Sequence, residues 1–275
     1  MNKYEKIRDI GKGNYGNTIL VRDRKNDHYV MKIINISQMS QKEKRQCLKE
    51  VELLSKLNHP FIVKYIESYI EGDTLRIVMK HCKGGDLYHY IQNKKKQNTP
   101  IKEKRILIWL TQILTALKFL HSNHILHRDM KSLNILIDSD KRVRLCDFGI
   151  SKVLENTLDY ANTLIGTPYY LSPELCKDKK YSWPSDIPDL PNIYSKELNN
   201  IYKSMLIREP SYRATVQQLL VSDIVQRQLK LLIEEKIREK QSMKKPLKEK
   251  PAIENENSGA NEQEVKTLLL DVVDT

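Results

Sequence analysis

The sequence predicts an α+β fold in two lobes, a small β-sheet with one helix followed by a mainly helical lobe. Three observations support this prediction. Strand-like runs with turn signals fill residues 4–36 and 62–79, one helical run separates them, and apolar residues recur at helical spacing from Leu87 onward. A chain of 275 residues is long enough to bury a core in such a fold.

The first lobe, residues 4–82, is expected to contain five strands and one helix. The helix is predicted because apolar residues between Leu48 and Leu57 recur at helical spacing. The run Lys83-Gly84-Gly85-Asp86 then breaks the pattern and is typical of a hinge. In chain order the expected elements are strands at Ile7–Gly16, Thr18–Val21 and Tyr29–Ile34, a helix at Ser40–Leu57, and strands at Ile62–Ile70 and Thr74–Met79.

The second lobe, residues 83–224, is predicted to be mainly helical. Its strongest helix is Ile106–Leu120, whose leucines and isoleucines form a broad apolar face. A turn at Asp138-Ser139-Asp140 lies between two short strand runs, which are expected to pair as a hairpin. These strands are Ile135–Ile137 and Val143–Cys146, and further helices are expected at Ser195–Leu206 and Val216–Val225.

The tail, residues 225–275, has a different composition. Its stretch 227–251 is rich in Lys and Glu and predicts a frayed, solvated helix, and 252–263 is typical of disorder. Val265–Val273 is a short apolar patch that could dock on another surface.

The charge of the chain limits the partners that it predicts. The formal net charge is +12, and the tail holds 10 Lys+Arg against 10 Asp+Glu, so residues 1–224 carry the excess. One cluster, Lys94-Lys95-Lys96, is followed by Lys102, Lys104 and Arg105. Because no zinc-finger, helix-turn-helix or aromatic RNA-binding motif accompanies it, we interpret this cluster as a solvated face and expect no nucleic-acid partner.

The sequence also predicts no targeting signal and no metal-binding pattern of cysteines. No apolar run reaches about 18 residues, and the N-terminus lacks the apolar core of a secretory signal, so we expect no membrane association and a location in the cytoplasm or nucleus. The four cysteines form no CxxC pair and no metal-ligand spacing. They are expected to be reduced structural thiols.

A glycine-rich run predicts a phosphate-binding loop. Gly11, Gly13 and Gly16 let the backbone close over phosphates, and a strand rather than a helix follows them, unlike the loop of dinucleotide-binding folds. Lys32 lies inside an apolar strand, where an ammonium favours an anionic partner such as Glu50 of the next helix or a nucleotide phosphate. An ordinary glycine-rich hairpin and a solvent-facing lysine are the alternatives for these two features.

The strongest signal is a set of polar residues around the predicted hairpin. Pairing of its strands puts Asn134, before the first strand, beside Asp147, after the second, and their oxygens suit a magnesium ion. Asp129 and Lys131 precede them on the same loop. A carboxylate to accept a hydroxyl proton, a cation for a moving phosphoryl group and two metal ligands predict phosphoryl transfer. Chance polar residues in turns are the alternative, and they explain this combination poorly.

These motifs together resemble the protein kinase family. His127–Asn134 reads HRDMKSLN, Asp147-Phe148-Gly149 reads DFG, and Ser172-Pro173-Glu174 is similar to the family's APE motif. The resemblance implies the two-lobed protein-kinase fold, ATP and Mg²⁺ as cofactors, and a protein substrate. Lys131 implies serine/threonine specificity. The stretches Asn58–Val63, Val78-Met79, Cys82–Leu87 and Gly166–Glu174 are similar to NIMA-related (NEK) kinases, whose partners include microtubule, centrosome or cilium proteins.

The resemblance also assigns roles to single residues. It implies Asp129 as catalytic base, Lys131 as a phosphate-facing cation, and Asn134 and Asp147 as magnesium ligands. It places Lys32 on the ATP phosphates with Glu50 as its partner. The remaining implied positions are Met79 as gatekeeper, Lys80 to Cys82 as the adenine-binding hinge, Leu136 as a further nucleotide contact, Thr163 as an activating phosphosite that pairs with Arg128, and Thr167 as a regulatory residue. For Thr163 an unmodified loop threonine is the alternative.

One part of the family pattern is missing after Ile187. There the family continues into a long buried helix, whereas this chain reads Pro188-Asp189-Leu190-Pro191, and two prolines so close stop a helix. About 40 residues are absent by comparison with the family's domain organisation. We therefore expect a C-lobe that is incomplete after residue 187. A skipped exon or a faulty gene model explains such a gap more simply than a true truncated isoform.

The gap has a predicted physical consequence. Without the missing helix, the leucine-rich face around Leu110–Leu120 is expected to lack a partner. At about 1.5–3 kcal/mol per large side chain, a few such residues could remove a net stability of about 5–15 kcal/mol. The chain is accordingly expected to be weakly folded or weakly active. An active kinase, a catalytically impaired kinase-like binding module and a basic nucleic-acid binder are the three functional hypotheses, and the intact catalytic residues favour the first.

Overall fold

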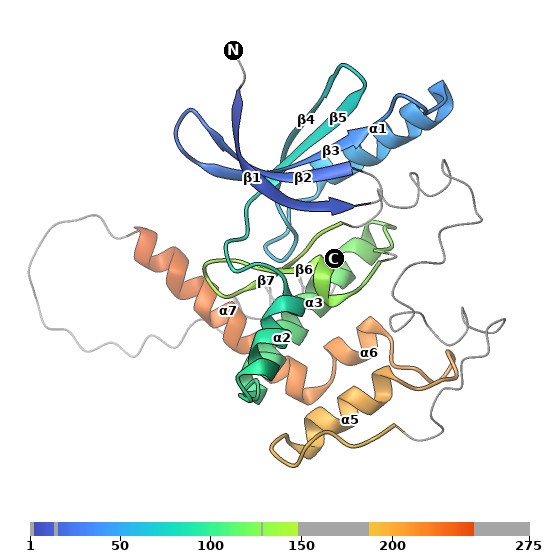
Figure 1. The fold of residues 1–275 in the computed structure, drawn as a ribbon. Helices are drawn as coiled ribbons and strands as arrows, with labels where there is room; N and C mark the ends of the chain where they lie inside the picture. Colours follow the sequence, from blue (N-terminus) through green and yellow to red (C-terminus); the bar gives the residue numbers. More distant parts are fainter. Residues whose placement is uncertain (1–2, 14–15, 128, 148–186, 245–275) are drawn as a thin grey trace, which may run out of the picture. The chain divides into compact units, whose positions relative to one another are not determined.

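The computed structural model describes residues 3–13, 16–127, 129–147 and 187–244, which divide into two compact units (Figure 1). The first unit contains the described residues up to 100 and 123–147, and the second contains 101–122 and 187–244. The side chains of Gly13, Gln46, Glu50 and residues 239–244 lie outside the described set. So do Arg128 and residues 148–186, which include Thr163 and Thr167.

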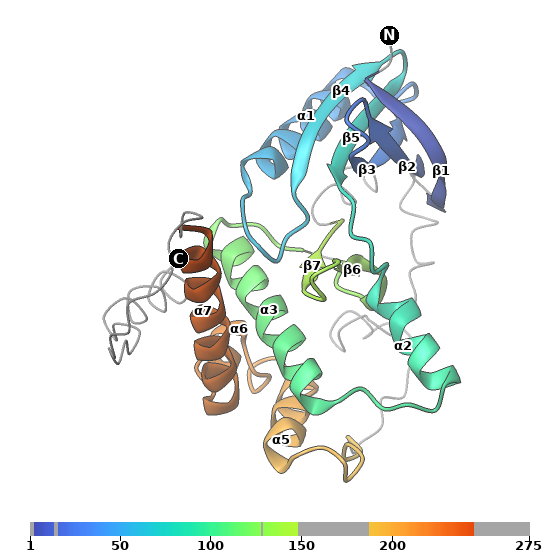
Figure 2. The same cartoon turned by 90° about the vertical axis from the view of Figure 1, so that its left-hand side faces the viewer.

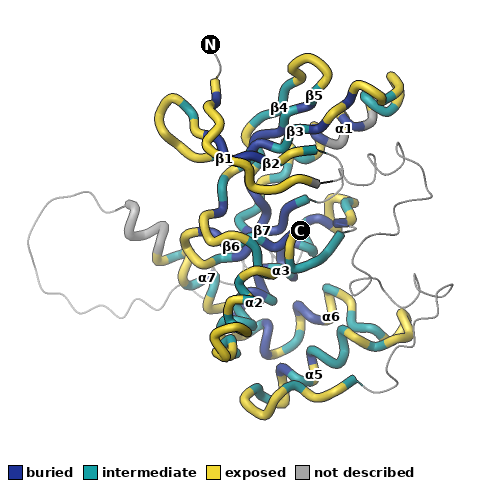
Figure 3. Tube along the Cα trace, viewed as in Figure 1, coloured by how far each residue is buried: buried dark blue, intermediate teal, exposed yellow. Residues whose placement is uncertain are grey.

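A five-stranded antiparallel sheet dominates the first unit, in the order β1-β2-β3-β5-β4. Buried residues gather on its middle strands, as Figure 3 shows. All five predicted strands are present, but β1 ends at Gly13 and Gly16, its predicted end, begins β2, where the two glycines pair. β4 begins at Tyr65 instead of Ile62, because the backbones of Phe61 and Val63 bond to Leu145. The strands are β1 (Tyr4–Gly13), β2 (Gly16–Asp23), β3 (His28–Asn35), β4 (Tyr65–Glu71) and β5 (Thr74–Lys80).

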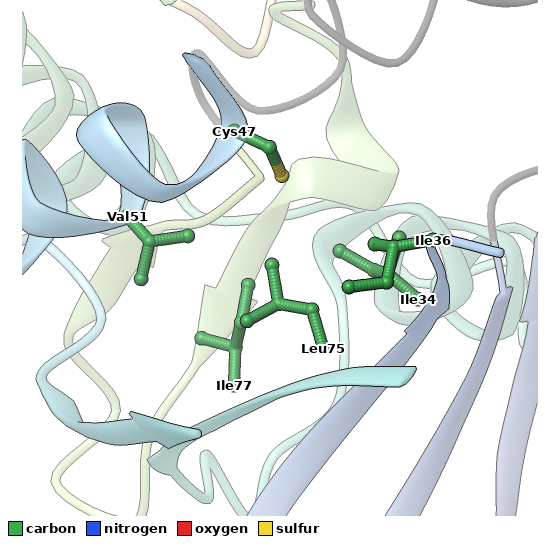
Figure 4. Packing of buried hydrophobic residues seen from close by; sticks show 6 residues of the cluster. All are labelled: Ile34, Ile36, Cys47, Val51, Leu75 and Ile77. Carbon is green, nitrogen blue, oxygen red and sulfur yellow. The ribbon is translucent and has the colours of Figure 1, made fainter. Parts of the chain in front are cut away.

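One helix, α1 (Gln41–Lys56), packs against this sheet (Figure 4). Its predicted start is confirmed, since Ser40 caps the helix and forms a reciprocal capping box with Glu43. Cys47 and Val51 point from the helix into an apolar cluster whose other members come from the sheet and the residue after β3. Those members are Ile34, Ile36, Leu75 and Ile77. This packing holds β3, which carries Lys32, against the helix.

The first unit also contains the predicted hairpin, β6 (Ile135–Ile137) and β7 (Val143–Leu145). A short 3-10 turn, η1 (Ser132–Asn134), leads into β6. The helix α2 (Leu87–Lys96) begins after Asp86, whose side chain accepts from the backbone of His89. The predicted hinge before α2 pairs with β6, because Gly84 donates to the carbonyl of Ile137 at 2.8 Å. A Cβ on Gly84 would lie 2.7 Å from that carbonyl oxygen, so this close approach requires glycine.

The second unit consists of four helices in its described part. Figure 2 shows α3 and α7 side by side, in agreement with their close contact. None of the described helices in either unit is both long and apolar enough to cross a bilayer. The four are α3 (Glu103–Ser122), α5 (Lys196–Met205), α6 (Val216–Leu220) and α7 (Asp223–Lys244).

The apolar face of α3 is covered, so the prediction that it lacks a partner is wrong. Leu114 on α3 joins a buried cluster with Ile201 of α5, Leu220 of α6 and Val225 of α7. Leu107 and Leu110 of α3 pack against the same cluster. The helices that follow the gap in the sequence therefore form a core with α3.

The region predicted as a solvated helix also contains buried apolar residues. The predicted helix Val216–Val225 is two helices, because the chain turns at Val221–Ser222 before α7 begins. Within α7, Leu229 and Ile233 are only 3% and 5% exposed. Apolar residues recur at helical spacing among the many Lys and Glu residues of this segment. Composition alone does not reveal such spacing, and it therefore predicted a frayed helix.

Candidate active site

The residues predicted as metal ligands lie at one end of the hairpin. Ile135 pairs with Leu145, and the backbone amide of Cys146 donates to the carbonyl of Asn134 at 3.0 Å. Asp147 follows Cys146 directly and has a φ of 57°, in the left-handed region. The predicted juxtaposition of Asn134 and Asp147 is therefore confirmed in the backbone.

The loop before the hairpin brings three predicted residues into direct contact. The Nδ2 atom of Asn134 donates to the Asp129 carboxylate at 2.8 Å and to its backbone carbonyl at 2.9 Å. The Nζ atom of Lys131 lies 2.6 Å from the same carboxylate. Asp129 is thus held between an amide and an ammonium, and 39% of its side chain remains exposed. An oriented carboxylate that is still accessible is what a proton acceptor needs.

Lys32 contacts Asp147 from the sheet. It lies on β3, where it pairs with Thr18 of β2 and Ile77 of β5, and its side chain is only 17% exposed. Its Nζ atom is 2.9 Å from Oδ1 of Asp147. This contact was not foreseen from the sequence. The expected partner, Glu50, is placed on α1, but its side chain lies outside the described residues.

The three glycines of the run lie on the strands β1 and β2. Gly11 and Gly13 lie on β1, and Gly13 pairs with Gly16 at the start of β2. Gly16 has a φ of 147°, and a Cβ there would lie 1.8 Å from the carbonyl oxygen of Ile33 on β3. Gly11 has nothing within 4 Å of such a Cβ. The third glycine is therefore required by the fold itself, and the first is not.

The residues expected around adenine lie between the end of β5 and the hairpin. Cys82 and Cys146 share a buried cluster with Val63, and Leu136 and Met79 pack against it. Burial raises the pKa of the Cys82 thiol to about 12, which makes it unreactive at neutral pH. A small cavity of about 30 Å³ lies beside Met79. It is lined by Lys32, Leu54, Val63, Tyr65, Ile77, Met79, Cys146 and Asp147.

Comparison with known proteins identifies the family of the chain. Residues 4–190 match the protein kinase domain family. The chain belongs to the protein kinase family. Within it, the relatives are NEK kinases: the chain is 48% identical to mouse serine/threonine-protein kinase Nek1 over 188 residues, 68% of this chain. It is 37% identical to mouse Nek4 over 264 residues, 83% of this chain, and 40% identical to human Nek5 over 223 residues, 80% of this chain. These matches place the chain in the NIMA-related (NEK) branch of the kinase family.

The kinase chain spans only part of these relatives, namely 16% of mouse Nek1, 33% of mouse Nek4 and 30% of human Nek5. The match to Nek4 also contains a gap. It extends over 264 positions, whereas 83% of 275 residues is about 228, so about 36 positions of Nek4 have no counterpart in this kinase. That number is close to the roughly 40 residues expected to be missing from the family's domain organisation. The match to human Nek5 differs, since it extends over 223 positions against about 220 residues, 80% of 275, and leaves only about 3 such positions.

A buried histidine contacts the loop that carries Asp129. The ring of His127 is only 3% exposed, and its Nδ1 atom accepts from the backbone amide of Asp129 at 3.4 Å. A protonated Nδ1 could not accept this bond. Burial lowers the pKa of His127 below its ordinary value, although the nearby Asp129 carboxylate opposes this shift. His127 is therefore neutral in the folded kinase at neutral pH.

This lowered pKa predicts a loss of stability in mild acid. Below the ordinary histidine pKa of about 6.5, the unfolded chain binds a proton at His127 that the folded chain does not bind, so unfolding becomes more favourable as pH falls. We expect the free energy of unfolding from urea titrations to be lower at about pH 5.5 than at about pH 7.5. The difference should be smaller in His127→Gln. An equal pH dependence in the two chains would contradict the role given to this histidine.

The two glycines predict opposite results for one substitution. Gly16→Ala is expected to destabilise the nucleotide-free kinase by about 1–3 kcal/mol, because the new methyl group forces β2 away from Ile33. Gly11→Ala, the matched control, should unfold thermally like wild type without nucleotide. The measurement is thermal unfolding followed by circular dichroism. Similar melting temperatures for the two variants would show that the close contact at Gly16 can relax freely.

Proposed function

We propose that this chain is an ATP-dependent serine/threonine protein kinase that transfers the γ-phosphate of ATP to hydroxyl groups of proteins. The observation that carries the proposal is the position of the Asp129 carboxylate. Lys131 and Asn134 hold it from two sides, and Asn134 lies beside Asp147 at the end of the hairpin. The family membership and the NEK relatives support the same activity.

In the proposed reaction Asp129 is the catalytic base. The substrate hydroxyl oxygen forms a bond to the γ-phosphorus, and its proton passes to the Asp129 carboxylate. The bond between the γ-phosphorus and the oxygen that bridges to the β-phosphate breaks, and its electron pair remains on ADP. Lys131, 2.6 Å from Asp129, supplies a positive charge beside the oxygens of the moving phosphoryl group.

The residues at the end of the hairpin fit a magnesium ion. The Nδ2 atom of Asn134 is already bonded to Asp129, so its Oδ1 atom is the one suited to a metal. The Asp147 carboxylate supplies the second protein oxygen, and hard oxygen ligands are those that Mg²⁺ prefers. When bound, the ion would neutralise charge on the phosphates.

The remaining contacts to ATP are assigned from the sheet. Gly11 and Gly13 on β1 and Gly16 on β2 are proposed to lie over the phosphates, and Lys32 is proposed to move from Asp147 toward the α- and β-phosphates. Met79 is the proposed gatekeeper, since it lines the small cavity. The backbone of Lys80 to Cys82 and the side chain of Leu136 are the proposed adenine contacts, and Glu50 is the proposed second partner of Lys32.

The lobe boundaries, the regulatory residues, the location and the partners are also proposals. Residues 4–82 and 83–224 are the proposed lobes and 225–275 the tail, with a C-lobe that lacks the family's segment after residue 187. The gap of about 36 positions against Nek4 supports this. Arg128, Thr163 and Thr167, all outside the described residues, are the proposed regulatory set. A cytoplasmic location, microtubule- or cilium-associated protein partners and the lack of nucleic-acid and membrane partners rest on the sequence alone.

Transfer of labelled phosphate from ATP to a generic protein substrate tests the proposal. We expect transfer in the presence of Mg²⁺, complete loss after chelation with EDTA, and recovery when Mg²⁺ is restored. Thermal unfolding with and without Mg·ADP is measured in parallel. A melting temperature raised by Mg·ADP without any transfer would favour the impaired binding module, which the alignment gap makes the second candidate.

A further inference from the structure

A buried carboxylate outside the proposed set of catalytic residues connects several parts of the site. Asp138 follows β6, and its side chain is only 4% exposed. Its Oδ2 atom lies 3.3 Å from Nζ of Lys80 and accepts from Nε of Arg144 at 3.0 Å. Its Oδ1 atom accepts from the backbone amide of Ser139 at 2.8 Å. The Asp138 carboxylate thus pairs with two cations and accepts a hydrogen bond from one backbone amide.

The partners of Asp138 come from separate stretches of the chain. Lys80 is the last residue of β5, where the proposed adenine-binding segment, residues 80–82, begins. Arg144 lies on β7, and its guanidinium also donates to the carbonyl of Pro60 in the loop before β4. Asp138 therefore joins the end of β5, that loop and the hairpin. The hairpin carries Asn134 at its start and leads directly into Asp147.

The electrostatics make this junction depend on the charge of Asp138. Burial alone would raise the pKa of its carboxyl, but the Ser139 amide, Arg144 and Lys80 outweigh burial and hold the pKa below its ordinary value. The carboxylate is therefore ionised at neutral pH. Without its charge, Lys80 and Arg144 would face the same point as two cations, with only Asp140, 3.3 Å from a terminal nitrogen of Arg144, left as an anion beside them, and like charges repel. Such repulsion would separate the segment 80–82 from the hairpin.

We propose that Asp138, acting through Lys80 and Arg144, is a positioning residue that sets the distance between the adenine-binding segment and the hairpin that bears the metal ligands. This inference rests on the proposed function, because it assumes that nucleotide binds between these two parts. Its effect falls on nucleotide affinity. Neither Asp138 nor Lys80 touches the proposed reacting atoms, so kcat changes little.

Nucleotide affinity of three variants of the full chain tests the proposal. Dissociation constants for Mg·ADP are measured by calorimetry for Lys80→Met, Asp138→Asn and the double variant. We expect each single variant to bind about tenfold more weakly, a loss equal to about 1.4 kcal/mol. The double variant should bind no more weakly than Asp138→Asn, because Lys80 has already lost its partner. Where transfer is observed, KM for ATP should rise by about the same factor with kcat nearly unchanged.

Conservative and control variants separate positioning from general stability. Lys80→Arg keeps the cation and should restore wild-type affinity. Lys56→Met removes a lysine from an exposed pair with Glu52 on α1 and should bind Mg·ADP like wild type. Because Lys80 is half exposed, Lys80→Met should fold even if Asp138→Asn does not.

Three outcomes would decide against parts of this account. Wild-type affinity in Lys80→Met, with or without a lower melting temperature, overturns the positioning role. A wild-type chain that binds Mg·ADP but transfers no phosphate contradicts the kinase activity and leaves the affinity test in force. A wild-type chain that binds no Mg·ADP contradicts both proposals.

Discussion

Asp147→Asn is expected to lower kcat for phosphate transfer about a thousandfold, as the loss of one preorganised charge-stabilising group does in other active sites. Asp147 supplies the full negative charge of the proposed metal pair, since Asn134 is neutral. Its Oδ1 atom also accepts from Lys32 at 2.9 Å. The backbone should survive the change, because φ is 57° at this position and Asn tolerates the left-handed region better than most residues. Steady-state transfer assays at saturating ATP measure the effect.

A matched control for this variant is Asp73→Asn. Asp73 lies exposed in the turn between β4 and β5, and its backbone carbonyl accepts from Ile36, a bond that the substitution keeps. We expect wild-type kcat in this control and equal melting temperatures for both variants. If Asp147→Asn retained wild-type kcat while folded, Asp147 could not be a metal ligand of the reaction, and the phosphoryl-transfer assignment would lose its main support.

The elements nearest the site could be predicted well from the sequence, for local reasons. The hairpin strands are predicted almost residue for residue, because the Asp138–Asp140 turn separates two short apolar runs that are neighbours in the sequence and pair with each other. The start of α1 was also predicted from a local signal, because Ser40 and Glu43 form a capping box within one turn. The position of Asn134 beside Asp147 was predicted from the pairing of the hairpin strands.

Contacts between distant parts of the chain could not be predicted in the same way. Lys32 and Asp147 are separated by 115 positions, and a strand lysine can meet several carboxylates, so its partner is decided by tertiary structure. The ion cluster around Asp138 is similar. Lys80 and Asp138 are separated by 58 positions, so their pairing beside Arg144 is likewise decided by tertiary structure.

The packing of the second unit was missed for a related reason. Composition described the start of the tail as charged, but Leu229 and Ile233 recur at helical spacing and are buried. The prediction of an uncovered α3 face assumed that only the family's missing helix could cover it. Cluster members from α5, α6 and α7 occupy that face in this chain.

Leu220→Ala tests whether this substitute core stabilises the second unit. Leu220 on α6 is fully buried in the cluster with Leu114 and Val225. Its truncation is expected to cost about 2–5 kcal/mol, from lost burial and from the cavity left behind. Urea unfolding can be followed by the fluorescence of Trp109 in α3, which is 5% exposed, in a Trp183→Phe background that leaves it as the sole tryptophan.

The exposed Leu231 of α7 provides the matched control for Leu220→Ala. Its side chain is 51% exposed, so Leu231→Ala should change the free energy of unfolding by no more than about 0.5 kcal/mol. A large difference between the two variants would mean that α6 and α7 stabilise α3 without the family's segment. If instead both variants unfolded at the same urea concentration as wild type, the cluster would contribute nothing to stability, and the original expectation of a weakly folded lobe would be restored.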